Sequence, residues 1–92
     1  LNKVGTRIET CCGDASLLQR NTYDVILANI NRNILLQDIP TYSLCLRKDG
    51  LLFVSGFYVE DMPMIIGMAQ NSGLTYVSHD SIDNWCCIKF SR

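Results

Sequence analysis

Residues 24–33 read DVILANINRN, and this stretch decides the fold. Its apolar part, Val25 to Ala28, is continuous and rich in branched side chains, which is typical of a strand buried on both faces of a sheet. Such strands belong to α/β proteins, which bind ligands at the carboxyl ends of their parallel strands. At that end the sequence places three amides, Asn29, Asn31 and Asn33. They indicate a ligand site, although asparagine also favours plain turns.

The segment that follows has the apolar spacing of a helix. Its apolar residues lie between Ile34 and Leu46 and leave one wide apolar face. Pro40 lies inside this segment and predicts a break or a second helix start at residues 38–41, because proline removes an amide donor. Arg47 and Lys48 suit the C-terminus of the helix, where the macrodipole is negative.

Further strands and one more helix surround this pair. We expect strands at Arg7–Cys12, Leu51–Gly56, Leu74–His79 and Trp85–Phe90, a helical turn at Ala15–Gln19, a helix at Glu60–Ser72 and a hairpin loop at Asp80–Asn84. Strands separated by helices predict parallel neighbours with right-handed crossovers, and the short final loop predicts an antiparallel pair. The fold class is therefore α/β.

Composition excludes several function classes. The net charge of -1 gives no electrostatic argument for nucleic acid or membrane binding, and no apolar stretch approaches the roughly 20 residues that span a bilayer. The five cysteines, at positions 11, 12, 45, 86 and 87, are odd in number and lack C-x-x-C spacing. They predict reduced, metal-free thiols in a cytoplasmic protein. In a strand, adjacent cysteines face opposite sides, so one of each adjacent pair is expected to be accessible.

Several motifs resemble the PrmA type of ribosomal-protein methyltransferase, a class I methyltransferase family that uses S-adenosylmethionine. Residues 29–33 resemble the Asn-Ile-x-x-Asn signature of that family, and residues 46–52 followed by Ser55-Gly56-Phe57 resemble its turn, strand and Ser-Gly end. Residues 13–15 match the turn beside the adenine, and Asn84-Trp85 matches the closing strand. The resemblance covers nearly all 92 residues.

The resemblance implies the C-terminal half of a Rossmann-like class I methyltransferase sheet, mostly parallel with a final antiparallel hairpin. The family's glycine-rich cofactor loop, the acidic residue after its second strand and its substrate-recognition domain have no counterpart in these residues. We therefore expect residues 1–92 to be a C-terminal fragment of the catalytic domain.

The resemblance also assigns roles to individual residues. Methyl transfer to an amine requires desolvation and alignment of the amine rather than a nucleophile or a metal. Asn29 is implied as the catalytic orienting group, with its amide oxygen accepting a hydrogen bond from the amine. Contacts with S-adenosylmethionine are implied for Gly13, Asp14, Ala15 and Asn29, and contacts with the acceptor for Ile30, Asn31, Ser55, Gly56 and Phe57. The implied acceptor is an amino group of a large-subunit ribosomal protein of the protein-eleven type.

Each assignment has a plainer alternative. One of Asn31 and Asn33 is expected to be a helix N-cap, Asp14 equally suits an Asx turn, and Gly56 suits any close backbone approach. The whole chain also fits a non-catalytic α/β interaction module, and its partner surface would comprise Phe57, Tyr58, Met62 and Met64. A nucleotide-binding regulatory domain is disfavoured because a phosphate-binding loop is absent from the sequence.

The family's first two strands have no counterpart in these residues, and their absence affects the expected sheet. In the family, the first strand lies beside the strand containing Val25 to Ala28, and the second and third follow outward. Without them this strand is expected to have an open edge, which invites pairing with another chain. Residues 13–22 are near the lower limit for a parallel crossover. We therefore expect the chain to self-associate or to leave its first dozen residues displaced, and to bind S-adenosylmethionine weakly on its own.

Overall fold

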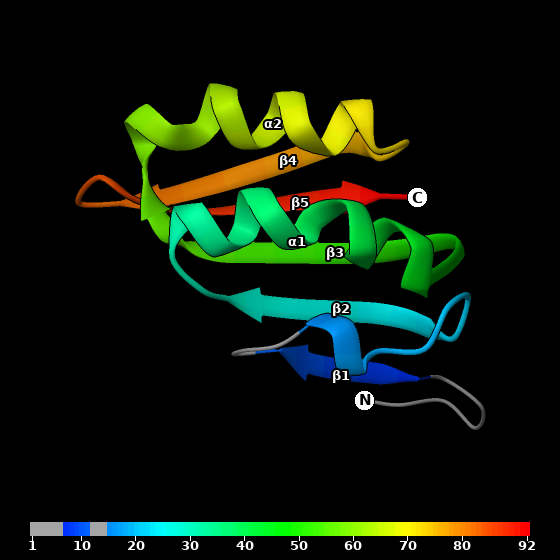
Figure 1. Cartoon of the computed structure of the whole chain (residues 1–92). Coiled ribbons are helices and arrows are strands. Elements are labelled where there is room, and N and C mark those ends of the chain that lie inside the picture. Colours follow the sequence, from blue (N-terminus) through cyan, green and yellow to red (C-terminus); the bar gives the residue numbers. More distant parts are fainter. Residues whose placement is uncertain (1–6, 12–14) are drawn as a thin grey trace.

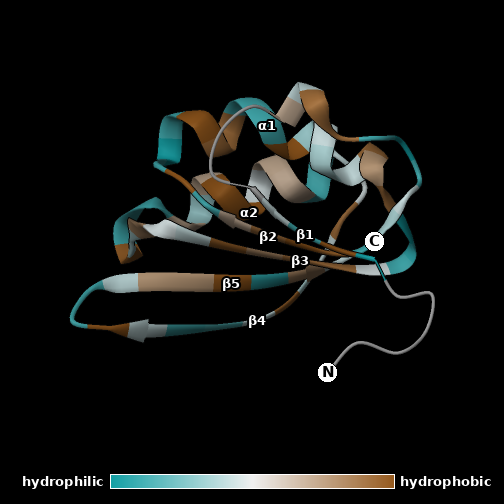
Figure 2. Ribbon diagram, turned by 90° about the horizontal axis from the view of Figure 1, so that it is seen from below, coloured by the Kyte–Doolittle hydropathy of each residue, from teal (hydrophilic) through white to brown (hydrophobic). Residues whose placement is uncertain are grey.

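The computed structural model describes residues 7–11 and 15–92. In this part of the chain the strands form a mixed sheet in the order β1-β2-β3-β5-β4, and both α-helices lie on one of its faces (Figure 1, Figure 2). The elements are β1 (Ile8–Cys11), η1 (Ala15–Leu17), β2 (Tyr23–Asn29), α1 (Arg32–Cys45), β3 (Leu46–Tyr58), η2 (Val59–Asp61), α2 (Met62–Asn71), β4 (Thr75–Ile82) and β5 (Trp85–Ser91).

Strand pairing follows the predicted pattern. β1 and β3 both run parallel to β2, whereas β5 runs antiparallel to β3 and to β4. The final hairpin turns more tightly than predicted, because β4 extends to Ile82 and leaves Asp83 and Asn84 as the turn. Both turn residues have positive φ, 49° and 70°. This is the conformation that two-residue hairpins need, and among residues with a side chain asparagine and aspartate tolerate it best.

The predicted break at Pro40 is wrong, because α1 runs unbroken from Arg32 to Cys45. Pro40 lies on the exposed side of the helix, whereas its neighbours Ile39 and Tyr42 are completely buried. Burial of large side chains on both sides of the proline outweighs the cost of a proline inside a helix, about 3 kcal/mol, which combines a lost hydrogen bond with a clash of the ring.

The predicted position of Arg47 and Lys48 at the helix C-terminus is also wrong. β3 begins at Leu46 directly after α1, so both basic residues belong to the strand. The amide N–H of Leu46 closes the helix by donating to the carbonyl of Tyr42. Arg47 instead pairs with Asp24 of β2, with 3.2 Å between Nη1 and Oδ2.

Only one face of the sheet is covered in the described residues. The side chains beneath the helices are completely buried, among them Ile26, Leu52, Val54, Ile88 and Phe90. On the opposite face Ile8 and Leu27 are 44% and 37% exposed. The prediction that β2 is buried on both faces is therefore wrong, because no described helix lies on that side (Figure 2). Among the described helices, none has the length and apolar character needed to cross a membrane.

The predicted open edge of β2 is wrong as well. β1 covers this edge by pairing with β2 from Ile8 opposite Val25 to Cys11 opposite Ala28. It thereby occupies the place beside β2 that the resemblance assigns to a different strand. Displacement of the first dozen residues from the family position and self-association both stay predictions.

Candidate functional site

The carboxyl ends of β2 and β3 bring the two predicted signature segments together. Asn29 lies opposite Ser55 in the parallel ladder, and the amide N–H of Ile30 donates to the carbonyl of Ser55 at 3.1 Å. Gly56 has a φ of 102°, and a Cβ at this position would lie 2.5 Å from the carbonyl oxygen of Ile30 and 3.1 Å from Oδ1 of Asn29. Glycine is therefore required here both by the backbone conformation and by the close approach of the two segments.

The other two asparagines lie at the start of α1. Asn31 is the N-cap, because its Oδ1 accepts a hydrogen bond from the amide N–H of Ile34 at 3.1 Å. This confirms the capping role that was expected of one of the pair. Asn33 is exposed, and its Oδ1 accepts a hydrogen bond from Nε of Arg32 at 3.3 Å. The amide oxygen of Asn31 is thus engaged in holding the helix.

A pocket of about 400 Å³ opens beside these strand ends. It is lined by Asn31, Arg32, Asn33, Gly56, Phe57, Tyr58, Glu60, Asp61 and Trp85. Of the predicted acceptor residues, Asn31, Gly56 and Phe57 line it, whereas Ile30 and Ser55 do not. Asn29 is exposed just outside it, with its Oδ1 directed to the Gly56 position.

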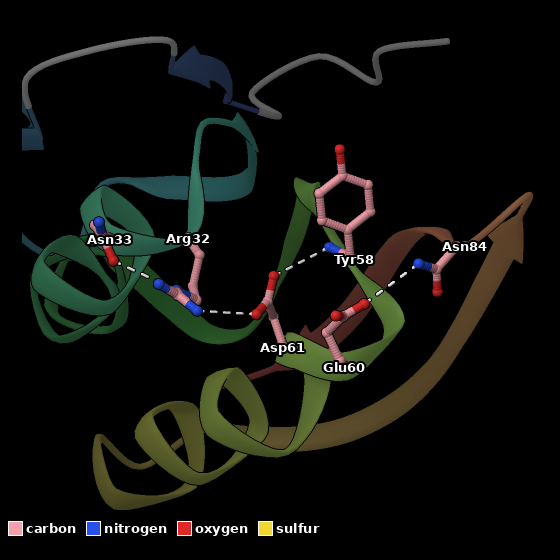
Figure 3. Close-up of polar contacts among 6 residues, drawn as sticks. All are labelled: Arg32, Asn33, Tyr58, Glu60, Asp61 and Asn84. Carbon is pink, nitrogen blue, oxygen red and sulfur yellow. Dashed lines mark hydrogen bonds and ion pairs between the residues drawn. The ribbon is translucent and has the colours of Figure 1, made fainter.

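A buried carboxylate ties the two sides of the pocket together. Asp61 is 8% exposed and accepts hydrogen bonds from Nη1 of Arg32 at 3.1 Å and from the amide N–H of Tyr58 at 3.2 Å (Figure 3). Arg32 belongs to the first turn of α1, and Tyr58 ends β3. The carboxylate therefore fixes the beginning of α1 against the end of β3, which are the elements that carry the two signatures.

Aromatic and polar side chains form one edge of the pocket. The rings of Tyr58 and Trp85 meet edge to face with 5.0 Å between centroids, and both side chains are about half exposed. Beside them Nδ2 of Asn84 donates to Oε1 of Glu60 at 3.3 Å (Figure 3). We call Tyr58, Glu60 and Trp85 the aromatic rim.

Sequence reasoning missed the charged residues of this site. In the sequence pattern Arg32 is only a spacer within the asparagine signature, and Glu60 and Asp61 only begin a predicted helix. One signal was available, since Asp61 directly precedes the first turn of α2, where an aspartate is expected to cap. Its side chain instead reaches back to Tyr58 and across to Arg32. The sequence pattern places Trp85 only in the closing strand.

The predicted cofactor residues are only partly covered by the structure. Gly13 and Asp14 lie outside the described residues. Ala15 is buried at the start of η1, and Asn29 is exposed at the end of β2. Within the described part of the chain, no group of three or more histidine, cysteine, aspartate or glutamate side chains could hold a metal. A metal-free protein stays a prediction.

Three of the cysteines are described as free thiols. As the strand alternation predicts, Cys86 is buried and Cys87 is half-buried. Burial raises the pKa of the Cys45, Cys86 and Cys87 thiols. The nearby Asp61 carboxylate further raises the pKa of Cys86, and Asp80 does the same for Cys87. The side chains of Cys11 and Cys12 lie outside the described residues.

We expect Cys87 to react with iodoacetamide before Cys45 and Cys86, because its side chain is the least buried of the three. The thiolate is the reactive form, and the raised pKa keeps the thiol protonated at neutral pH. The alkylation rate of Cys87 should therefore continue to rise as the pH passes the ordinary pKa of a cysteine thiol. Peptide mapping by mass spectrometry at several pH values measures this for each site. Faster labelling of Cys86, or a rate that levels off near neutral pH, would contradict it.

Solved structures place this fold in one class of protein. The parallel start and the antiparallel end of the sheet are shared with class I methyltransferases. The ribosomal protein L11 methylase from Lactobacillus delbrueckii subsp. bulgaricus matches with a TM-score of 0.71 and 29% identity, over 75% of this chain and 36% of that one. The antibiotic-resistance methyltransferase Kmr matches in fold, with a TM-score of 0.61 and 9% identity over 86% of this chain and 56% of that one.

Sequence comparison identifies the family. The protein-family model described as "Ribosomal protein L11 methyltransferase (PrmA)" matches residues 1–92, and the chain belongs to this family. The ribosomal protein L11 methyltransferase of Bacteroides fragilis is 47% identical over 91 residues, which cover 98% of this chain and 32% of that protein. The Phocaeicola vulgatus protein of the same name is 48% identical over 79 residues, 85% of this chain and 28% of that one. The chain thus spans about a third of the length of these relatives, and the predicted family is confirmed.

Proposed function

We propose that this chain is the C-terminal part of the catalytic domain of an S-adenosylmethionine-dependent protein N-methyltransferase. The proposed acceptors are amino groups of ribosomal protein L11, and the proposed location is the cytoplasm. The observation that supports this function is the close approach of Gly56 to Asn29 and Ile30. A Cβ atom at Gly56 would lie 2.5 Å from the carbonyl oxygen of Ile30 and 3.1 Å from Oδ1 of Asn29. This close approach joins the two segments that resemble the family signatures at the mouth of one pocket.

The exposed amide of Asn29 suits the alignment of an amine. Its Oδ1 and the carbonyl oxygen of Ile30 both lie close to Gly56, which carries no side chain that would cover them. An amine that donates to such oxygens keeps its lone pair free to attack. S-adenosylmethionine supplies the methyl group on a sulfonium centre. As the new N–C bond formed, the bond between the methyl carbon and the sulfonium sulfur would break and leave a neutral thioether, and the nitrogen would then release its proton to water. Asn29 would act in this step by orientation and charge stabilisation.

The residues expected to contact the cofactor fit it only in part. Asn29 offers an uncharged donor and acceptor at the strand end, and buried Ala15 offers close backbone packing. The groups that hold the methionine portion and the ribose hydroxyls belong, in the resemblance, to the cofactor loop and to the acidic residue after the second strand. We therefore propose that tight cofactor binding requires a chain of the relatives' full length.

The interaction-module alternative is less well supported. Its proposed surface needs Phe57, Tyr58, Met62 and Met64 to face outward together. Phe57 is only 1% exposed, and Met62 is partly buried against the core, so the four do not form a continuous patch. Tyr58 and Met64 are exposed separately.

A chimera tests the proposed function directly. In it, residues 1–92 replace the matching residues of the Bacteroides fragilis relative, which are 47% identical. We expect the chimera to bind S-adenosylmethionine in calorimetric titrations and to transfer labelled methyl groups to ribosomal protein L11. The 92-residue chain alone should give no saturable binding, because it lacks most of the expected cofactor contacts.

The chimera and the isolated chain fail in different ways. A chimera that binds the cofactor but methylates no L11 amino group would overturn the proposed function. Micromolar or tighter cofactor affinity of the isolated chain would instead contradict its interpretation as a fragment. Light scattering on the same sample tests the predicted self-association.

A further inference from the structure

We propose that Glu60, together with Tyr58 and Trp85, forms a binding site for a protonated lysine side chain of the acceptor protein. This inference rests on the proposed function, because it names what the aromatic rim recognises when an acceptor enters the pocket. The site is distinct from the amide and carbonyl oxygens at the end of β2, which are proposed to align the reacting amine.

The charges around the pocket leave Glu60 without a cationic partner. Among the described residues, ion pairs join Arg32 to Asp61 and Arg47 to Asp24, and neither involves Glu60. The positive charge of Arg32 is thus matched by Asp61, so the described charged residues of the pocket sum to one negative charge, located on Glu60. This residue is exposed, so its carboxylate is accessible to an arriving ligand.

The hydrogen bonds at the rim hold this carboxylate in place. Nδ2 of Asn84 donates to Oε1 of Glu60 and comes from the tight turn between β4 and β5. The amide N–H of Val59 donates to the carbonyl of Asn84 at 3.0 Å, which joins the same turn to the start of η2. Oε2 of Glu60 accepts no hydrogen bond from a described residue. One carboxylate oxygen is therefore fixed while the other is available.

The aromatic side chains add a second attraction for a cation. Tyr58 and Trp85 are 50% and 49% exposed at the pocket edge and hold each other edge to face. An ammonium group near such rings is attracted by the negative charge of the ring faces. A lysine also offers a long apolar stem, which packs on aromatic surfaces while its charge stays in water. Carboxylate and rings together therefore match the chemistry of lysine better than that of a neutral or acidic residue.

The test uses the chimera with the substitution Glu60→Gln and the matched control Glu9→Gln. Glu9 is the only other glutamate of the chain and lies on β1, away from the pocket. At neutral pH and low salt we expect Glu60→Gln to raise the KM for ribosomal protein L11 about fivefold, with little change in kcat. Glu9→Gln should leave both values unchanged.

The pH and salt dependence separate charge recognition from a structural effect. The KM difference should shrink as the pH approaches about 10.4, where lysine loses its charge. It should also shrink at high salt, which screens exposed charges. Glu60→Asp keeps the charge on a shorter side chain, and it should recover part of the lost affinity.

The possible failures are distinguishable. An active chimera whose KM is unaffected by Glu60→Gln, or whose KM change is the same at every pH, would overturn the lysine site and leave the proposed function standing. A chimera that methylates no acceptor before any substitution would overturn the proposed function, and the lysine site with it.

Discussion

Replacing Asn29 with alanine in the chimera is expected to lower kcat by about 10²–10³-fold, while the melting temperature stays almost unchanged. A loss of this size corresponds to about 2.7–4 kcal/mol, the amount that one oriented amide contact contributes in comparable sites. The side chain is exposed at the end of β2, so its removal leaves no cavity in the core. The expected signature is therefore a large effect on rate with little effect on stability.

The measurement compares methyl transfer at saturating cofactor with thermal unfolding of the same samples. Asn71→Ala is the matched control, because Asn71 is an exposed asparagine at the far end of α2, outside the pocket. It should retain the parent rate. If Asn29→Ala and the parent turn over equally fast at saturating cofactor, the orienting role of Asn29 is excluded.

Gly56→Ala is expected to have the largest effect on stability, a loss of about 3 kcal/mol. Two costs combine at this position. The φ of 102° is strained for any residue with a side chain, and the added methyl group would lie 2.5 Å from the carbonyl oxygen of Ile30. Relief of this clash requires the ends of β2 and β3 to separate, so activity should fall with stability.

Two other glycines separate the two costs. Gly73 has a φ of 93° but has only the Ser43 hydroxyl within 4.0 Å of its Cβ position, so alanine there meets the conformational cost alone. Gly67 lies within α2 with open space around it, and alanine should stabilise the helix by about 1 kcal/mol. Thermal unfolding should therefore rank Gly67→Ala above the parent, Gly73→Ala below it and Gly56→Ala lowest. A Gly56→Ala variant as stable as Gly73→Ala would show that the close approach is unimportant.

The sequence predicted those parts of the fold that local patterns determine. The apolar run from Val25 to Ala28 forms a strand as predicted, because branched apolar residues fit few other structures. Asp83 and Asn84 form the final turn within the predicted loop. The break predicted at Pro40 is wrong because the cost of a proline is visible in the local sequence, whereas the burial of Ile39 and Tyr42 that offsets it depends on the sheet beneath the helix.

The site was less predictable because its contacts are distant in sequence. Asp61 and Arg32 are 29 residues apart, and Glu60 and Asn84 are 24 apart. Neither pair has a characteristic spacing, so the aromatic rim became visible only when the fold placed the end of β3 beside the β4–β5 turn. Asn29 and Gly56 could be proposed earlier because each lies within a contiguous signature.

The pairing of β1 with β2 has a consequence for the energetics of a longer chain. β1 has four residues, it has one neighbour in the described part of the sheet, and its Ile8 is 44% exposed. Such a segment opens at a small fraction of the free energy needed to unfold the whole domain. Another strand of the same polypeptide would therefore compete for β2 by simple exchange, while β3, β5 and the helices stay folded. Which strand pairs with β2 depends on the difference in pairing free energy between β1 and the competing strand. The strand order at this edge of the sheet is therefore a property of the whole polypeptide.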